Sequence, residues 1–243
     1  MKQSTRQVRI FIGTMVLAAA VSTGYAAYAS HAVHPAYALA LLTLAAVTSR
    51  MKVKLPGING NMSVNMPFLL IAVINLSAAE AVIVACVSTL VQTWPKSQGK
   101  FKPEQMLFNV SMMAFAASLA SVLWRAGWIG KTAWASEPLM LASATATFFF
   151  GQTASVAGII KLTEGVAMRR IWLSLAQLSF PYFVVSAGVT SMVNTVSHHA
   201  GWKLALAVFP VMFCVYRSFQ LYFGSTGKLS AAPSLARAAV AGK

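Results

Sequence analysis

Apolar residues form eight runs along the chain, separated by short polar breaks. The runs cover residues 10–29, 36–49, 66–77, 78–95, 106–124, 138–160, 171–193 and 203–223. Several of them approach the roughly 20 residues that cross a bilayer as a helix. The third run has about twelve residues, so it is expected to be short, tilted, re-entrant or partly interfacial. The pattern predicts an all-α fold, a polytopic transmembrane bundle of about eight membrane segments.

The composition agrees with a membrane protein. Of the 243 residues 58% are hydrophobic and 9% are charged, whereas a soluble domain has about a quarter charged residues. A net charge of +15 would indicate nucleic acid binding in a soluble chain, but these cations lie in short breaks beside apolar runs. Cations at such positions set the orientation of membrane helices and contact anionic lipid. We therefore expect membrane lipids as partners, and no nucleic acid.

The cations also provide an independent test of the eight runs. When the N-terminus is placed in the cytoplasm, each of the five inner segments carries three cations. These are Lys2, Arg6, Arg9, Arg50, Lys52, Lys54, Lys96, Lys100, Lys102, Lys161, Arg169, Arg170, Lys228, Arg237 and Lys243. The outer segments carry only Arg125, Lys131 and Lys203. Because cytoplasmic loops are rich in Lys and Arg, this distribution predicts eight crossings with both termini in the cytoplasm.

The chain is expected to form one transmembrane domain over residues 1–224, followed by a basic tail over residues 225–243. The first apolar run is longer than the roughly 7–15 residues of a signal peptide and is expected to be a membrane helix. The tail has too few large apolar residues to form a core, so it is expected to be flexible.

Ionisable side chains are missing from the middle of every apolar run. A retinal Schiff base needs a Lys there, and a proton relay needs carboxylates. The chain is therefore not expected to be an enzyme or to carry a cofactor. Cys86 and Cys214 lie inside apolar runs without a CxxC motif and are interpreted as packing residues.

Glu80 lies between two membrane segments. The sequence Ser-Ala-Ala-Glu from Ser77 to Glu80 matches a capping box, in which the two side chains cap each other's backbone N–H groups. This favours a helix start at Ser77, and a ligand or ion role for Glu80 is the alternative.

All four histidines fall in predicted outer loops, with His31 and His34 after the first run and His198 and His199 after the seventh. Imidazoles from two loops can bind zinc or sense pH. Their spacing is not a metal signature, so ordinary loop positions are favoured and these residues are only weak candidates for metal.

Polar side chains within the runs are the candidate ligand-binding residues. An amide in an apolar run needs a hydrogen-bond partner or water, and such groups often tie helices together. If a ligand pocket exists, these amides and nearby aromatic residues are its expected lining. The candidates are Asn75, Asn109, Phe149, Gln152, Gln177, Tyr182 and Asn194. Arg217, in the inner half of the last run, is expected to reach lipid phosphate.

Residues 50–70 combine three cations with glycines, asparagines and two prolines. Pro67 suits the first turn of the following helix, and the glycines and asparagines allow turns. We predict an ordered cytoplasmic loop from Leu55 to Pro67 that packs back on the bundle.

Two stretches, "KLPGINGNMSVNMPFLLIAVINLSAAEAVIVACVSTLVQ" and "KPEQMLFNVSMMAFAASLA", resemble the multi-helix membrane sensor region found N-terminal to some bacterial HD-GYP and GGDEF signalling domains. The matching residues are Leu55, Pro56, Gly57, Ser63, Phe68, Phe108 and Asn109. "YRSFQLYFG", residues 216–224, is similar to the exit helix of that architecture. Here no HD or GGDEF signature follows that helix. A looser likeness, of general form only, is to the solute-binding membrane subunits of vitamin uptake systems.

The resemblance implies a sensor-like module of a bacterial cytoplasmic (inner) membrane. It would bind a small or lipidic ligand and act through a membrane or cytoplasmic protein partner or a homo-oligomer. A transporter or a solute-binding transport subunit is one alternative, and a structural subunit of a membrane assembly is another. The sequence leaves all three open.

Overall fold

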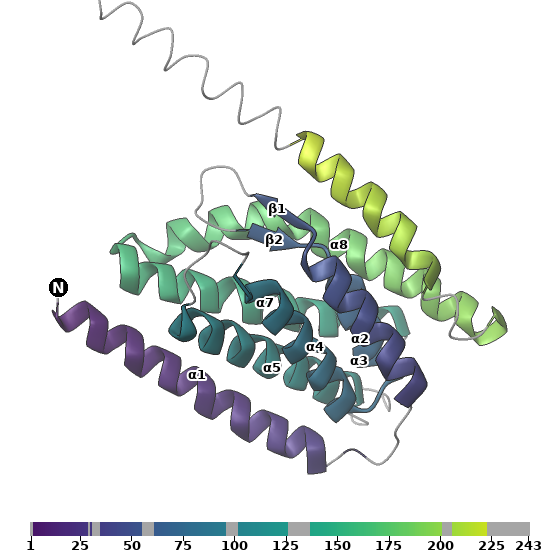
Figure 1. Cartoon of the computed structure of the whole chain (residues 1–243), viewed down its shortest axis with the longest axis horizontal. Helices are drawn as coiled ribbons and strands as arrows, with labels where there is room; N and C mark the ends of the chain where they lie inside the picture. Colours follow the sequence, from purple (N-terminus) through teal and green to yellow (C-terminus); the bar gives the residue numbers. More distant parts are fainter. Residues whose placement is uncertain are drawn as a thin grey trace, which may run out of the picture.

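The computed structural model describes residues 2–28, 30, 35–54, 61–95, 102–125, 137–200 and 206–222. Within these residues the chain forms eight helices and one small antiparallel sheet (Figure 1). The helices are α1 (Lys2–Tyr28), α2 (Pro35–Ser49), α3 (Met66–Asn75), α4 (Ala78–Thr93), α5 (Pro103–Arg125), α7 (Glu137–Glu164), α8 (Met168–Ala200) and a last helix over 206–222. Each corresponds to one predicted apolar run, so the all-α prediction is confirmed.

Four of these helices are long and apolar enough to cross a membrane. They span Arg6–Tyr28, Pro103–Arg125, Glu137–Glu164 and Met168–Val196. These four helices indicate a membrane protein. The helices α2, α3 and α4 are apolar but shorter.

The helix α3 is enclosed by the other helices of the bundle. From Met66 to Val73 every side chain is buried, and Phe68 and Leu70 are fully so. Ten residues of α-helix are about 15 Å long, half of the roughly 30 Å apolar thickness of a bilayer. The prediction of a short third segment is thus confirmed.

A two-stranded hairpin precedes α3, which the sequence pattern did not predict. Strand β1 (Lys52–Lys54) pairs with β2 (Asn61–Ser63), and Val53 lies opposite Met62. Both Val53 and Val64 are 1% exposed, because the hairpin packs into the core. Strand pairing satisfies backbone groups that a plain loop would leave without partners inside an apolar bundle. The described part of the predicted loop therefore packs on the bundle, and residues 55–60 lie outside the described residues.

Polar contacts hold the junction between the hairpin and α3. The Ser63 hydroxyl donates to Asn65 Oδ1 at 2.9 Å, and Asn65 Nδ2 donates to Ser88 Oγ of α4 at 3.5 Å. Asn65 is 5% exposed. Pro67 occupies the first turn of α3, as predicted.

The start of α4 confirms the predicted capping box. The Ser77 side chain accepts a hydrogen bond from the Glu80 backbone N–H at 3.3 Å, and Glu80 Oε2 accepts from the Ser77 N–H at 3.0 Å. Glu80 is 9% exposed. The carboxylate thus serves the helix terminus between α3 and α4.

The helices α5 and α7 approach each other closely at small residues. A Cβ on Gly151 would lie 3.3 Å from the Ala116 Cβ, and a Cβ on Gly158 would lie 3.0 Å from the Phe11 ring of α1. A side chain at Gly158 would therefore require the Phe11 ring to shift slightly.

Several hydrogen bonds and one ion pair connect the ends of different helices. In each case the charge pattern assigns both helix ends to the same side of the membrane. At the predicted outer side, three pairs of helix ends meet. Ser30 Oγ accepts from the Ala79 N–H at 3.0 Å, Arg125 donates to the Leu76 carbonyl, and Asn194 donates to Glu137. At the predicted inner side, Arg50 Nη1 donates to the Trp94 carbonyl at 3.3 Å, and Arg9 lies 3.4 Å from Glu104.

Candidate ligand-binding site

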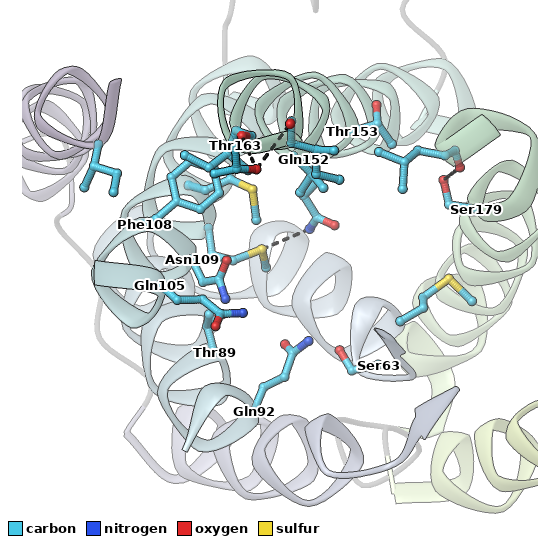
Figure 2. A pocket seen from close by; sticks show the side chains of 18 of the residues that line it. Ser63, Thr89, Gln92, Gln105, Phe108, Asn109, Gln152, Thr153, Thr163 and Ser179 are labelled. Carbon is cyan, nitrogen blue, oxygen red and sulfur yellow. Dashed lines mark hydrogen bonds between the residues drawn. The ribbon is translucent and has the colours of Figure 1, made fainter. Parts of the chain in front are cut away.

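A cavity of about 610 Å³ lies among the ends of the helices that carry the predicted inner loops (Figure 2). Its walls come from α1, β2, the start of α3, the end of α4, the first half of α5, the second half of α7 and the first half of α8. This volume falls within the roughly 300–1,000 Å³ of small-molecule sites. The hairpin contributes to the wall because it enters the bundle beside α3.

Four lining residues that contact one another, Met66, Met113, Gln152 and Tyr182, are here called the cavity floor. Gln152 Nε2 lies 3.0 Å from Met113 Sδ and 4.0 Å from Met66 Sδ. A thioether sulfur is a weak acceptor. Within the described part of the chain no oxygen accepts a hydrogen bond from this amide, and its own carbonyl oxygen receives none. Gln152 is half-buried, and the surrounding fold therefore leaves part of its hydrogen-bonding capacity unused.

Tyr182 fixes the floor to the hairpin and α3. Its hydroxyl accepts the backbone N–H of Met66 at 2.9 Å, which satisfies the first donor of α3. The Tyr182 side chain is 2% exposed. Fourteen residues of α8 precede Tyr182, which places Tyr182 about 20 Å along the axis of α8 from its first residue. The helix α3 begins beside this point.

Three more amides point into the cavity. They are Gln92 of α4 and Gln105 and Asn109 of α5 (Figure 2). None of the three makes a side-chain hydrogen bond to another described residue. The hydroxyls of Ser63 and Thr89 line the same space. Donors and acceptors from several walls are thus presented to whatever fills the cavity.

Charged lining residues lie at the opening, here called the cavity mouth, and they are Lys102, Glu104 and Glu164. All three are exposed and stand at helix ends. Glu104 also pairs with Arg9 of α1 at 3.4 Å. The mouth therefore carries both signs of charge.

The remaining walls are mostly apolar. The hydroxyls of Thr153, Thr163 and Ser179 also line them, and each donates to a backbone carbonyl of its own helix. Met62, Met112 and Phe108 line the cavity beside Phe183 and Ile160. Thioethers are flexible and polarisable, and they contact aromatic rings favourably. These walls suit a ring or a chain held between the amides.

The last helix contacts the floor through Tyr182. The ring of Tyr182 meets Phe219 edge to face at 6.4 Å and 85°, and it meets Phe183 at 6.0 Å. A side chain that caps α3 and lines the cavity therefore also contacts the helix that leads out of the bundle.

The structure brings three of the predicted ligand-binding residues together, because Asn109, Gln152 and Tyr182 all line the cavity. Phe149 is 8% exposed and packs behind the wall, where its ring meets that of Phe183 at 5.3 Å.

The other candidates lie elsewhere. Asn75 donates to the Ile71 carbonyl at 3.3 Å near the end of α3, Gln177 is exposed on α8, and Asn194 bonds Glu137 at the opposite end of the bundle. Arg217 is exposed on the last helix.

The side chains of the four histidines lie outside the described residues, so the weak metal candidates are not tested by the structure. His31 and His34 lie outside the described residues, and so do the side chains of His198 and His199, which fall within α8 rather than in a loop. In the described part of the chain, no group of three His, Cys, Asp or Glu side chains gathers to hold a metal ion.

Sequence reasoning missed Asn65, Gln92 and Gln105, because they lie at the ends of apolar runs and read as loop residues. Three residues quoted for the resemblance, Ser63, Phe108 and Asn109, also line the cavity. Comparison with protein-family models, with curated proteins and with solved structures finds no match for this chain.

Proposed function

We propose that this chain is a multi-pass sensor-like module that binds a small or lipidic ligand in the cavity and acts through a partner protein. The observation that carries the proposal is the set of amides facing one cavity without oxygen or nitrogen partners in the described residues. Because these partly exposed amides have hydrogen-bonding capacity that the fold does not use, the cavity is suited to an occupant that hydrogen-bonds.

The location proposed is a bacterial cytoplasmic membrane, with eight membrane segments and both termini in the cytoplasm. The cation distribution supports this topology. The contacts between helix ends also support it, since each joins two ends that the charge pattern puts on one side. On this topology the cavity opens toward the cytoplasm.

Action through a partner is supported by the last helix. Phe219 contacts Tyr182 of the cavity floor, and the side chains of Tyr216 and Gln220 bond each other near its end. A ligand that moves Tyr182 would change the packing of this helix. The resemblance to sensor regions, in which this helix leads to the output, points to the same end of the bundle.

The ligand proposal is tested by gentle extraction of the protein and native mass spectrometry. We expect a small molecule to remain bound to the wild type and to the Gln177→Leu control, and to be lost from Gln152→Leu. Both substitutions replace one amide by an apolar side chain, but only Gln152 lines the cavity. Equal retention by both variants would contradict binding at this site.

The topology is tested by cysteine accessibility in a background without Cys86 and Cys214. A cysteine at Ser30 is expected to react with a reagent that does not cross the membrane when the reagent is added from outside. A cysteine at Tyr222, which is 66% exposed, should react only from the cytoplasmic side. The reverse labelling would contradict the topology.

The partner proposal uses the same Tyr222→Cys variant for crosslinking in native membranes. We expect a discrete adduct with a second protein or a second copy of the chain. Recovery of monomer alone would move a transporter or solute-binding subunit to first place. The open cavity and the short helix α3, which resembles the broken helices of transporters, favour that second function.

A further inference from the structure

The chemistry of the cavity defines a class of ligand. We infer, on the basis of the proposed binding function, that the cavity takes an uncharged ring compound with a cyclic amide edge, in which a carbonyl and an N–H stand side by side. Three observations carry this inference: where the charges lie, how the amide of Gln152 is partnered, and what forms the walls.

The charged groups lie at the mouth. Among the described lining residues the ionised side chains are those of Lys102, Glu104 and Glu164, and all three are exposed. The floor and the space between the amides hold no countercharge. A ligand charge carried to that depth would lose its hydration without an ion to replace it, so the buried part of the ligand is neutral.

The amide of Gln152 lacks a strong acceptor. Its Nε2 reaches only the sulfurs of Met113 at 3.0 Å and Met66 at 4.0 Å, and its carbonyl oxygen receives no hydrogen bond in the described residues. On the edge that joins its oxygen and nitrogen, a primary amide presents one N–H donor and one carbonyl acceptor in a plane. The complementary group is an acceptor and a donor side by side, as in the bidentate contacts of Asn and Gln to adenine, and a cyclic amide presents such a pair as a carbonyl and an N–H.

The walls suit a flat body behind that edge. Met112 and Met113 stand on one side with Phe108, and Phe183 stands on α8. Thioethers and ring edges contact the face of a ring favourably. A cavity of about 610 Å³ has room for two or three fused rings. Gln105 and Asn109 then meet polar atoms on the ring edge that faces the mouth.

Three probes with one ring skeleton test this class. Quinolin-2(1H)-one carries the cyclic amide edge, 2-oxo-1,2-dihydroquinoline-4-carboxylate adds a charge, and naphthalene has neither. Binding of each to the full chain in lipid nanodiscs is measured by fluorescence, with empty nanodiscs subtracted. The variants are Gln152→Leu and the control Gln177→Leu, whose parent residue is exposed and outside the cavity.

We expect quinolin-2(1H)-one to bind the wild type and the Gln177→Leu control equally. Gln152→Leu should weaken it about 5- to 150-fold, the loss of one bidentate pair worth roughly 1–3 kcal/mol. The carboxylate should bind at least about tenfold more weakly than the neutral probe, because its charge lacks a partner at the floor. Naphthalene should be insensitive to Gln152→Leu.

Two results would overturn the inference while leaving the binding function intact. One is a carboxylate that binds as tightly as the neutral amide. The other is a quinolinone affinity that Gln152→Leu does not change, although a molecule is still retained in native mass spectrometry. If none of the three probes binds, the ligand class is wrong, and the retained molecule alone then decides whether the cavity is a binding site.

Discussion

The helices α5 and α1 are similar in length and hydropathy, yet the bundle uses them differently. In the most apolar stretch of α5 56% of the residues are buried, against 17% in α1. The buried side chains of α5 include the small residues Ala116, Ala117 and Ser118, whereas Leu17 and Val21 of α1 are each 66% exposed. Small residues let helices approach closely, and large apolar ones are equally well accommodated by lipid. Hydropathy alone therefore finds a membrane helix without saying whether it is central or peripheral.

The same contrast separates α3 from α1, and it should give the largest effect on stability. Leu70 of α3 is fully buried and Leu17 of α1 is 66% exposed. Leu70→Ala leaves a void in the core and is expected to cost roughly 2–5 kcal/mol, whereas Leu17→Ala should cost a small fraction of that. Unfolding in mixed detergent micelles measures both. Equal losses would show that α3 is not the centre of the bundle.

The next effect concerns the polar contacts that hold α3 in place. Tyr182→Phe removes the oxygen that accepts the buried N–H of Met66 and is expected to destabilise the fold by about 1–3 kcal/mol. The control is Tyr25→Phe, at a position 59% exposed on α1, which should be nearly neutral. If the two variants unfold alike, Tyr182 does not hold the start of α3.

A smaller effect is expected at the junction of α3 and α4. Ser77→Ala removes the cap of α4 and should cost about 0.5–2 kcal/mol. Glu80→Gln keeps a side chain that can reach back to the Ser77 N–H, so most of the stability should remain. A Glu80→Gln loss larger than that of Ser77→Ala, together with lost ligand retention, would indicate the ion or ligand role instead.

The smallest effect belongs to the peripheral helix. Arg9 and Glu104 are 71% and 61% exposed, so their ion pair should contribute less than about 1 kcal/mol and should weaken with salt. A double-mutant cycle with Arg9→Gln and Glu104→Gln, measured at low and at high ionic strength, gives the coupling. A large coupling that salt does not change would mean that α1 is held more tightly than its exposure indicates.

Much of the architecture followed from the sequence, and the exceptions have physical causes. Apolar runs gave all eight helices, and local rules gave the capping box at Ser77 and the place of Pro67. The hairpin was missed because strands of three residues carry no readable period. Its position depends on contacts that are distant in sequence, such as the packing of Met62 against Ile171 and Leu175 of α8.

The candidate site was predicted only in part for a similar reason. Amides in the middle of runs stand out, and of these Asn109 and Gln152 do line the cavity. Asn75 and Asn194 have the same local signal, but they bond Ile71 and Glu137 instead. Which amide faces a cavity and which ties helices together depends on the packing of α3 among its neighbours.

The central claim is that the cavity holds a hydrogen-bonding ligand, and a crystal structure of the protein grown from a lipidic phase tests it most directly. The account predicts non-protein density on the cavity floor, with a polar atom within about 3.2 Å of Gln152 Nε2. The same crystals of Gln152→Leu should lack that density. A floor filled only by a lipid chain, or by water bridging the amides in both proteins, would contradict the account.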